Sequence, residues 1–169
     1  MDQKLDDQTF VKCLESPLGD ITITTNETHL LALNFNKVGE KHPLDSSLPT
    51  IMTKTLAQLD SYFNKTLSVF DLPIDPPGTD FQKKVWQSLQ SIPLGNVLSY
   101  QKLAEQVDSI SKTRAVASAI AKNPILIIIP CHRVIGSNGK LTGYSGGIDK
   151  KRLLLLHESH INTDKTLLF

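Results

Sequence analysis

The sequence predicts a mixed α+β fold made of two small domains, and three observations support this prediction. Residues before about 36 contain three short runs rich in β-branched and apolar residues, separated by turn-like segments. Residues after 78 instead carry apolar side chains at helical spacing. Between them, the segment Asp71-Leu-Pro-Ile-Asp-Pro-Pro-Gly78 cannot sustain a helix and is typical of a stiff linker. We therefore expect an N-terminal domain over residues 1–77 and a C-terminal domain over residues 78–169.

The N-terminal domain is predicted to be a short antiparallel sheet followed by one helix. Ser16-Pro-Leu-Gly19 and Asn26-Glu-Thr28 are typical of turns and separate the expected strands. These strands cover residues 9–15, 19–25 and 29–35. Residues 37–49 are expected to form a loop, and apolar spacing predicts a helix over about 48–64. Cys13, with no base nearby, is interpreted as a core residue.

The C-terminal domain begins with a predicted helix capped by Thr79 or Asp80. Its apolar face consists of Phe81, Val85, Trp86, Leu89 and Ile92. Ser99 is a plausible cap for a second helix over 100–107, and the polar turn 108–111 leads to a third over 112–122. Two short helices joined by a tight turn have the outline of a helix-turn-helix.

The third of these helices has one face made almost entirely of Ala and Ser, beginning at Arg114. Small residues of this kind suit a close contact between helices. They equally suit a helix that enters a nucleic-acid groove, with Arg114 reaching in from its N-terminal end. The pattern alone leaves both interpretations open.

The remainder of the domain alternates between buried segments and loops. Asn123-Pro124 ends the third helix, because the residue before proline is displaced from helical geometry. The run 125–129 is β-branched and short, so a buried extended segment is expected. Four glycines place 136–147 in a loop, and 149–158 is expected to be a helix with Leu153, Leu154 and Leu156 facing inward.

Net charge separates the two halves of the chain. Residues 1–78 hold 6 basic and 11 acidic residues, whereas residues 79–169 hold 12 basic and 6 acidic ones. The split is compatible with chance, or with a basic half that meets a polyanion. The polar N-terminus and the short apolar runs predict neither a signal peptide nor a membrane span. Two distant cysteines without a CxxC motif predict a cytoplasmic protein with reduced thiols, or a nuclear one in a eukaryote.

Pro130-Cys131-His132-Arg133-Val134 is the segment most suited to chemistry. A thiolate is the reactive form of cysteine, and a neighbouring base or cation lowers the thiol pKa. His132 is the candidate base. Adjacent residues of an extended strand point to opposite sides, so we expect a bridging water between thiol and imidazole. Glu158 on the last helix is the best candidate to orient His132.

Ile129-Pro-Cys-His-Arg-Val-Ile135 resembles the active-site signature of the O6-alkylguanine-DNA alkyltransferases, or methylated-DNA–protein-cysteine methyltransferases. Other segments occur in the family's order and spacing, among them Gly78-Thr-Asp-Phe-Gln-Lys-Lys-Val-Trp86, Ile92-Pro-Leu-Gly95, Ser99-Tyr-Gln-Lys-Leu-Ala104, Arg114-Ala-Val116, Asn123-Pro124, Gly143-Tyr-Ser-Gly-Gly147 and His157-Glu158. The resemblance covers residues 78–160 closely and the N-terminal part in layout only. It implies a ribonuclease-H-like N-terminal domain and a winged-helix-like C-terminal one.

The resemblance implies a catalytic set of five residues. Cys131 resembles the alkyl acceptor, which takes the group from guanine O6 and is used once. His132 resembles the base that acts through water, and Glu158 the carboxylate that polarises it. Asn123 resembles the brace of the turn beside the thiol, and Tyr100 the proton donor to the departing guanine.

The resemblance also implies how DNA is held. Arg114 resembles the finger that fills the stack behind a flipped base. The DNA-binding set expected on this basis is Tyr100, Arg114, Ala115, Ala117, Ser118 and Lys122. Val134, Tyr144 and Ser145 resemble the substrate pocket, with the Cys131 and Val134 carbonyls reading the guanine amino group. No residue of the N-terminal domain, Met1 included, is expected to contribute to the site.

The expected partner is double-stranded DNA containing O6-alkylguanine, bound through its minor groove by a monomer, with no membrane, metal or organic cofactor. Cys13 with His29 and His42 does not form a convincing zinc set. Val97 stands where the family often has Thr, and Ala117 where many members have Gly. Three alternatives stand beside this hypothesis: a non-catalytic lesion sensor, which would lack Cys131, a helix-turn-helix regulator and a cysteine hydrolase.

Overall fold

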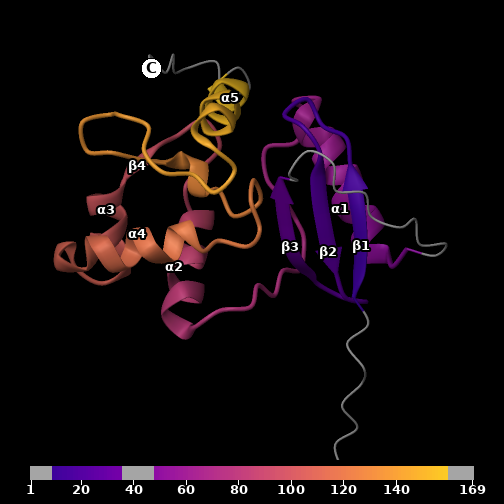
Figure 1. The fold of residues 1–169 in the computed structure, drawn as a ribbon, viewed down its shortest axis with the longest axis horizontal. Helices are drawn as coiled ribbons and strands as arrows, with labels where there is room; N and C mark the ends of the chain where they lie inside the picture. The colour runs from indigo at the N-terminus through magenta and orange to yellow at the C-terminus, as the bar shows by residue number, and fades with distance from the viewer. Residues whose placement is uncertain (1–8, 36–47, 160–169) are drawn as a thin grey trace, which may run out of the picture. The chain divides into compact units, whose positions relative to one another are not determined.

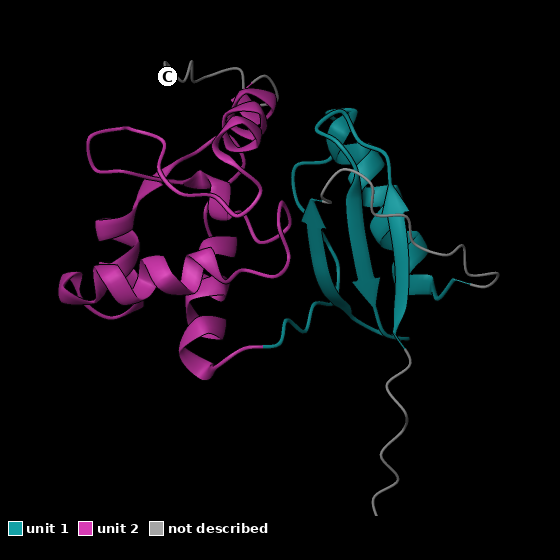
Figure 2. Cartoon of the chain, in the orientation of Figure 1, with its two compact units in different colours: residues 1–77 teal, residues 78–169 magenta. Residues whose placement is uncertain are grey.

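The structure is a computed structural model, and it describes residues 9–35 and 48–159. The chain divides into two compact units, residues 1–77 and 78–169 (Figure 2). The first combines a sheet with a helix and the second is mainly helical, so the predicted mixed α+β fold is confirmed. Most of the loop expected over 37–49 lies outside the described residues.

The first unit is a three-stranded antiparallel meander in the order β1-β2-β3 (Figure 1). Its strands are β1 (Phe10–Leu14), β2 (Ile21–Thr25) and β3 (Leu30–Phe35). Helix α1 (Thr50–Phe63) packs on this sheet, so the predicted strands and helix are confirmed. Cys13 pairs with Thr22 across β1 and β2 but is half-buried, which corrects its assignment to the core.

The linker begins as part of the first unit. The Leu30 amide donates to the Pro73 carbonyl at 2.9 Å, and the Asp75 amide donates to the Leu30 carbonyl at 3.0 Å. Ile74 therefore forms a parallel bridge with Leu30 at the start of β3. These bonds fix the first half of the proline-rich segment to the edge of the sheet before the chain leaves for the second unit.

The second unit contains four α-helices and one short parallel strand pair in its described residues (Figure 1). The helices are α2 (Asp80–Gln90), α3 (Tyr100–Val107), α4 (Thr113–Ala121) and α5 (Ile148–Ser159). The strands are β4 (Leu98–Ser99) and β5 (Val134–Ile135). Two 3₁₀ helices complete the unit, η1 (Ile110–Lys112) and η2 (Cys131–Arg133).

Local sequence explains where the helices begin. Thr79 and Gln82 form a reciprocal capping box at the start of α2. The Ser99 side chain accepts from the Lys102 amide and caps α3. The Trp86 indole donates to the Ala119 carbonyl at 2.8 Å and ties α2 to α4. Helices α3 and α4, joined through η1, form the expected helix-turn-helix.

The run 125–129 is a buried series of turns, not the expected extended segment. The Ile129 amide donates to the Ile125 carbonyl at 3.1 Å, and the Ile128 amide donates to the Leu126 carbonyl at 2.8 Å. Ile127 has a φ of 70°, an uncommon conformation for a β-branched residue. The apolar residues are buried as predicted, but these two backbone hydrogen bonds close within the run and turn the chain.

Helix α5 presents a different face to the core than hydropathy predicts. Its buried residues are Lys151, Leu154, Leu155 and Glu158, which follow helical spacing. Leu153 is 47% exposed and Leu156 is 38% exposed, so the expectation that both point inward was wrong. The helix turns Lys151 and Glu158 inward because both have partners there.

Candidate active site

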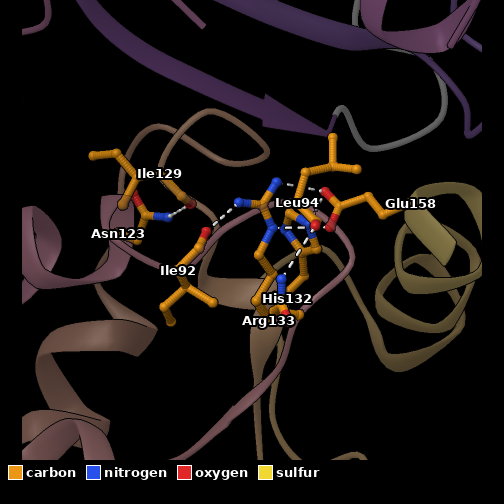
Figure 3. Close-up of polar contacts among 8 residues, drawn as sticks. Ile92, Leu94, Asn123, Ile129, His132, Arg133 and Glu158 are labelled. Carbon is orange, nitrogen blue, oxygen red and sulfur yellow. Dashed lines mark hydrogen bonds and ion pairs between the residues drawn. The ribbon is translucent and has the colours of Figure 1, made fainter. Parts of the chain in front are cut away.

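Asn123 organises the turn that precedes the cysteine. Its Nδ2 donates to the Ile129 carbonyl at 2.9 Å (Figure 3) and also lies 3.2 Å from Cys131 Sγ. Its Oδ1 accepts from the Ile125 amide at 2.9 Å. The side chain therefore spans the buried turn and contacts the thiol, which is the bracing position expected from the resemblance.

Cys131 is the first residue of the 3₁₀ helix η2 and is only 3% exposed. It was expected at the end of an extended strand, and the turns of 125–129 account for the difference. Burial raises the pKa of the Cys131 thiol to about 11, against opposing effects of the Asn123 hydrogen bond and the Lys151 charge. The expectation of a lowered thiol pKa was wrong, so the thiol holds its proton at neutral pH and needs a base to react.

His132 and Glu158 form a buried pair from two distant parts of the chain. His132 Nε2 lies 2.7 Å from Glu158 Oε1, and both side chains are almost fully buried (Figure 3). Burial lowers the pKa of His132, although the Glu158 carboxylate opposes this shift. The imidazole is therefore neutral at neutral pH, which a base must be.

Arg133 completes this cluster, and sequence reasoning gave it no role. Its Nε and Nη2 donate to the Glu158 carboxylate at 2.8 and 2.9 Å, and its Nη1 donates to the Ile92 carbonyl (Figure 3). Burial alone raises the pKa of Glu158, but His132 and Arg133 outweigh it and hold that pKa well below its usual range. The only available signal was the position of Arg133 directly after the Cys-His pair.

This arrangement fixes which nitrogen of His132 is the base. An ionised carboxylate accepts hydrogen bonds and donates none, so the Glu158 contact places the imidazole proton on Nε2. The lone pair then lies on Nδ1, which is buried and makes no hydrogen bond with any of the described residues. The pair supplies a neutral histidine with an available basic nitrogen beside the cysteine.

Lys151 is a second residue that sequence reasoning missed. It is fully buried, and its Nζ donates to the carbonyls of Val134 at 2.6 Å, Thr142 at 2.8 Å and Gly143 at 3.3 Å. Burial lowers its pKa to about 8. The ammonium also lies 5.8 Å from the centroid of the Tyr100 ring. Lys151 thus links α5 to β5 and to the glycine-rich loop.

A cavity of about 630 Å³ opens at Cys131. It brings together residues from α3, α4, η2 and the loop after β5. Six of the predicted site residues line it: Tyr100, Arg114, Ala117, Cys131, Tyr144 and Ser145. Val134 does not line it, because its side chain is fully buried and its carbonyl accepts from Lys151.

The hydroxyl groups of Tyr100 and Ser145, which line this cavity, have protein partners. Tyr100 Oη donates to the Thr142 carbonyl at 3.3 Å, and Ser145 Oγ donates to the Ala121 carbonyl at 2.9 Å. Burial raises the pKa of Tyr100, against the opposing effect of Thr142. Tyr100 is therefore neutral and keeps a proton to donate.

Helix α4 turns one polar face away from the core. Arg114, Ala115, Ser118 and Lys122 are exposed, and Ala117 is half-buried at the cavity wall. The opposite face, Val116, Ala119 and Ile120, is buried against the unit. The structure thus places all five predicted residues of this segment on the accessible side, with Arg114 and Ala117 at the cavity.

Two further observations concern the described residues. Within the described ranges, no three His, Cys, Asp or Glu side chains are grouped so as to hold a metal ion. None of the helices in this part of the chain is long and apolar enough to cross a membrane.

The fold and the site define a class of protein: one with a buried cysteine, a histidine–carboxylate pair beside it, and a helix-turn-helix whose second helix borders the same cavity. The chain belongs to the 6-O-methylguanine DNA methyltransferase family. Residues 80–160 match its DNA binding domain, and residues 9–76 match its ribonuclease-like domain.

Individual relatives agree with this assignment. The methylated-DNA–protein-cysteine methyltransferase of Methanosarcina barkeri is 45% identical over 155 residues, which are 89% of this chain and 98% of the relative. The crystal structure of Mycobacterium tuberculosis O6-methylguanine methyltransferase is 39% identical, with a TM-score of 0.81 over 90% of this chain and 94% of that one. A structure of the same organism's OGT in complex with DNA gives a TM-score of 0.80 at 39% identity, over 89% and 93% of the two chains.

Proposed function

We propose that this chain repairs alkylated DNA by direct reversal, with Cys131 taking the alkyl group from O6 of a guanine. It acts as a methylated-DNA–protein-cysteine methyltransferase. The observation that supports Cys131 as the acceptor is its position: the thiol lines the cavity bordered by Arg114 and Ala117 and is contacted by Asn123. Water does not displace the thioether product, so each molecule acts once.

The proton path follows from the histidine–carboxylate pair. The buried thiol is protonated at rest, so its proton must leave as the sulfur attacks the alkyl carbon. Nδ1 of His132 receives it through a water, and Glu158 stabilises the imidazolium that forms. The bond from the alkyl carbon to O6 breaks as the bond to Sγ forms, and guanine leaves with the electron pair.

Tyr100 supplies the proton that guanine needs as it leaves. Its hydroxyl borders the same cavity as Cys131 and is neutral at neutral pH. A phenol of this kind donates a proton to a leaving anion without carrying charge beforehand. Ser145 and Tyr144 also line this pocket, and Ser145 is hydrogen-bonded to the end of α4.

Access to O6 requires the base to leave the duplex. Unpairing and unstacking cost a few kcal/mol, and less for an alkylated base that pairs poorly. Arg114 is exposed at the cavity mouth, where it fills the stack behind the flipped nucleotide. The small residues Ala115 and Ser118 let α4 approach the minor groove, and one copy of the chain carries the complete site.

The deciding experiment follows a labelled methyl group. The protein is incubated with duplex DNA carrying radiolabelled O6-methylguanine, then digested with trypsin. We expect one methyl per molecule, on the peptide 123–133, whose only cysteine is Cys131. Cys131→Ala should abolish transfer and Cys13→Ala should preserve it. Multiple turnover would indicate a hydrolase, and binding without transfer would indicate a lesion sensor.

A further inference from the structure

Two unpartnered polar atoms belong to residues around Cys131. Within residues 9–35 and 48–159, the buried side-chain polar atoms without a hydrogen-bond partner are Thr25 Oγ1, His132 Nδ1 and Tyr144 Oη. Thr25 lies in the sheet of the other unit. The remaining two belong to the active site, and buried polar groups in proteins are normally hydrogen-bonded.

The residues that carry these two atoms are neighbours, and one of them shares a cavity with the thiol. The rings of His132 and Tyr144 meet edge to face, with centroids 6.4 Å apart and an interplanar angle of 82°. Tyr144 and Cys131 line the same cavity. Burial raises the pKa of Tyr144 well above its usual value, and Cys131 and Glu158 raise it further through the negative charge that each carries when ionised. The phenol is therefore a neutral hydrogen-bond donor on a residue that lines the cavity of the thiol.

Three other hydroxyl groups of the cavity already donate to carbonyl groups of the protein. Tyr100 Oη donates to Thr142, Ser145 Oγ donates to Ala121 and Thr113 Oγ1 donates to Ile110. The Tyr144 hydroxyl has no such contact. It is the candidate donor beside the thiol and the imidazole.

We propose that Tyr144 is a positioning residue for the proton transfer, its hydroxyl donating a hydrogen bond to the water between Cys131 Sγ and His132 Nδ1. This inference rests on the proposed function. A water has two acceptor and two donor positions, so it accepts from the thiol and from Tyr144 while it donates to Nδ1. The S–H proton passes to the water as a water proton passes to Nδ1, and Tyr144 keeps its own proton throughout.

The test is Tyr144→Phe in the full chain, which removes the hydroxyl and keeps the ring as a pocket wall. Single-turnover methyl transfer is measured from pH 6 to 9.5, together with the Kd for DNA carrying O6-methylguanine. We expect a rate about tenfold or more lower near pH 7, typical of a perturbed proton transfer, with little change in Kd. The deficit should narrow at high pH, where hydroxide removes the thiol proton directly.

Tyr62→Phe is the matched control, because Tyr62 is a fully buried tyrosine of the first unit. It should leave the rate per folded molecule unchanged. A double-mutant cycle with His132→Gln adds a second measurement: without the base, the loss of the Tyr144 hydroxyl should have little further effect. Full additivity of the two losses would contradict the proposal.

Other outcomes separate the possible failures. The proposal would be overturned if Tyr144→Phe transfers methyl at the wild-type rate, or if its rate is lower by the same factor at every pH. Tyr144 would then only line the pocket. If Tyr144→Phe does not fold, a fluorinated tyrosine at position 144 keeps the shape and lowers the phenol pKa. Its rate should fall as that phenol ionises, and an unchanged profile would overturn the proposal. Absence of transfer by the wild type would instead overturn the proposed function.

Discussion

Glu158 determines the chemistry of two neighbours at once, since it holds the proton of His132 on Nε2 and pairs with the guanidinium of Arg133. All three side chains are buried and His132 is neutral, so the charges of Glu158 and Arg133 compensate each other. Removing one partner of a buried ion pair leaves an uncompensated charge in a medium of low dielectric constant. Breaking the cluster by removing one partner should therefore destabilise the fold as well as the site.

Glu158→Gln should destabilise the protein by about 3–5 kcal/mol, because Arg133 would remain buried without a counter-charge. The measurement is the free energy of unfolding from urea denaturation. The control is Asp71→Asn, which breaks the exposed pair of Asp71 with Lys54 and should cost less than about 1 kcal/mol. Equal losses for the two variants would contradict the role of burial.

The same cluster makes stability depend on pH. The folded-state pKa of His132 lies below the ordinary value, so between the two the unfolded chain binds the proton more readily. The pKa of Glu158 is also lowered in the fold, and its contribution is lost as pH falls below the unfolded value near 4.3. Both shifts therefore favour unfolding in acid.

We expect the free energy of unfolding to fall from pH 7 to pH 5 through His132, and more steeply below pH 4.5 through Glu158. Urea denaturation at several pH values measures this directly. In His132→Gln the loss between pH 7 and pH 5 should be smaller. A wild-type stability that rises on acidification through this range would show that the cluster is not the dominant titrating group.

At the scale of one element, α5 contains residues of equal hydropathy that differ in burial. Leu154 is fully buried, whereas its neighbour Leu153 is 47% exposed. Leu154→Ala should cost about 2–5 kcal/mol through the cavity it leaves, and Leu153→Ala should stay within about 1 kcal/mol. Thermal or urea unfolding of the two variants compares identical substitutions on one helix. Similar losses would contradict the observed orientation.

The orientation of α5 marks the limit of what its sequence could predict. Hydropathy indicated the helix and its approximate ends, but it assigned Leu153 and Leu156 to the core. The buried face instead includes Lys151 and Glu158, whose partners lie on β5, η2 and the loop before the helix. Residues so distant in the chain carry no local signal, so the pairing became visible only with the fold.

The backbone of the turn 125–129 also could not be predicted from its local sequence. Its β-branched residues favour a strand, and their burial was predicted correctly. The backbone instead closes on itself, because Asn123 satisfies the amide of Ile125 and the carbonyl of Ile129. By contrast, the caps at Thr79 and Ser99 are local signals, and the starts of α2 and α3 followed directly from them.

Helix α4 carries the prediction that concerns DNA. Arg114→Ala should slow methyl transfer from duplex DNA by about 10- to 100-fold, since the duplex must open and unpairing costs a few kcal/mol. Transfer from a single-stranded oligonucleotide should change little, because it has no stack to refill. Arg152→Ala on α5 removes an exposed arginine of the same unit and serves as the control. Equal losses on both substrates would contradict a role in base flipping.

At the scale of the whole molecule, charge is distributed between the two units according to their proposed roles. Residues 1–77 carry a net charge of −5 and residues 78–169 carry +6. Arg133, Lys151 and Glu158 are buried and contribute +1 to the second value, which leaves +5 for the rest of that unit. The total charge of +1 hides this separation. The separation has a physical interpretation because the positively charged unit contains the helix-turn-helix, Arg114 and Cys131.

A modest positive charge makes affinity for DNA depend on salt in a defined way. Each neutralised phosphate contributes about −0.9 to the slope of log K against log salt concentration. Lys122→Gln should therefore reduce the magnitude of the slope by about 1, whereas Lys54→Gln in the first unit should leave it unchanged. Binding titrations at several salt concentrations measure both slopes. An unchanged slope in Lys122→Gln would show that this lysine does not contact a phosphate of the DNA.

Contacts to phosphates and contacts to the flipped base should have different effects when binding to methylated and intact DNA is compared. Phosphate contacts do not distinguish damaged from intact DNA, so Cys131→Ala should bind both duplexes with the same salt slope. Under the proposed function the pocket around Tyr144 and Ser145 contacts only the flipped base, so it should shift log K for the methylated duplex by a constant amount at every salt concentration. If the slopes differ, methylated DNA engages additional phosphates, and lesion recognition then extends beyond the cavity. If the plots of log K against log salt concentration for the two duplexes are parallel, recognition of the lesion lies in the pocket. The basic unit then binds undamaged DNA only through phosphate contacts.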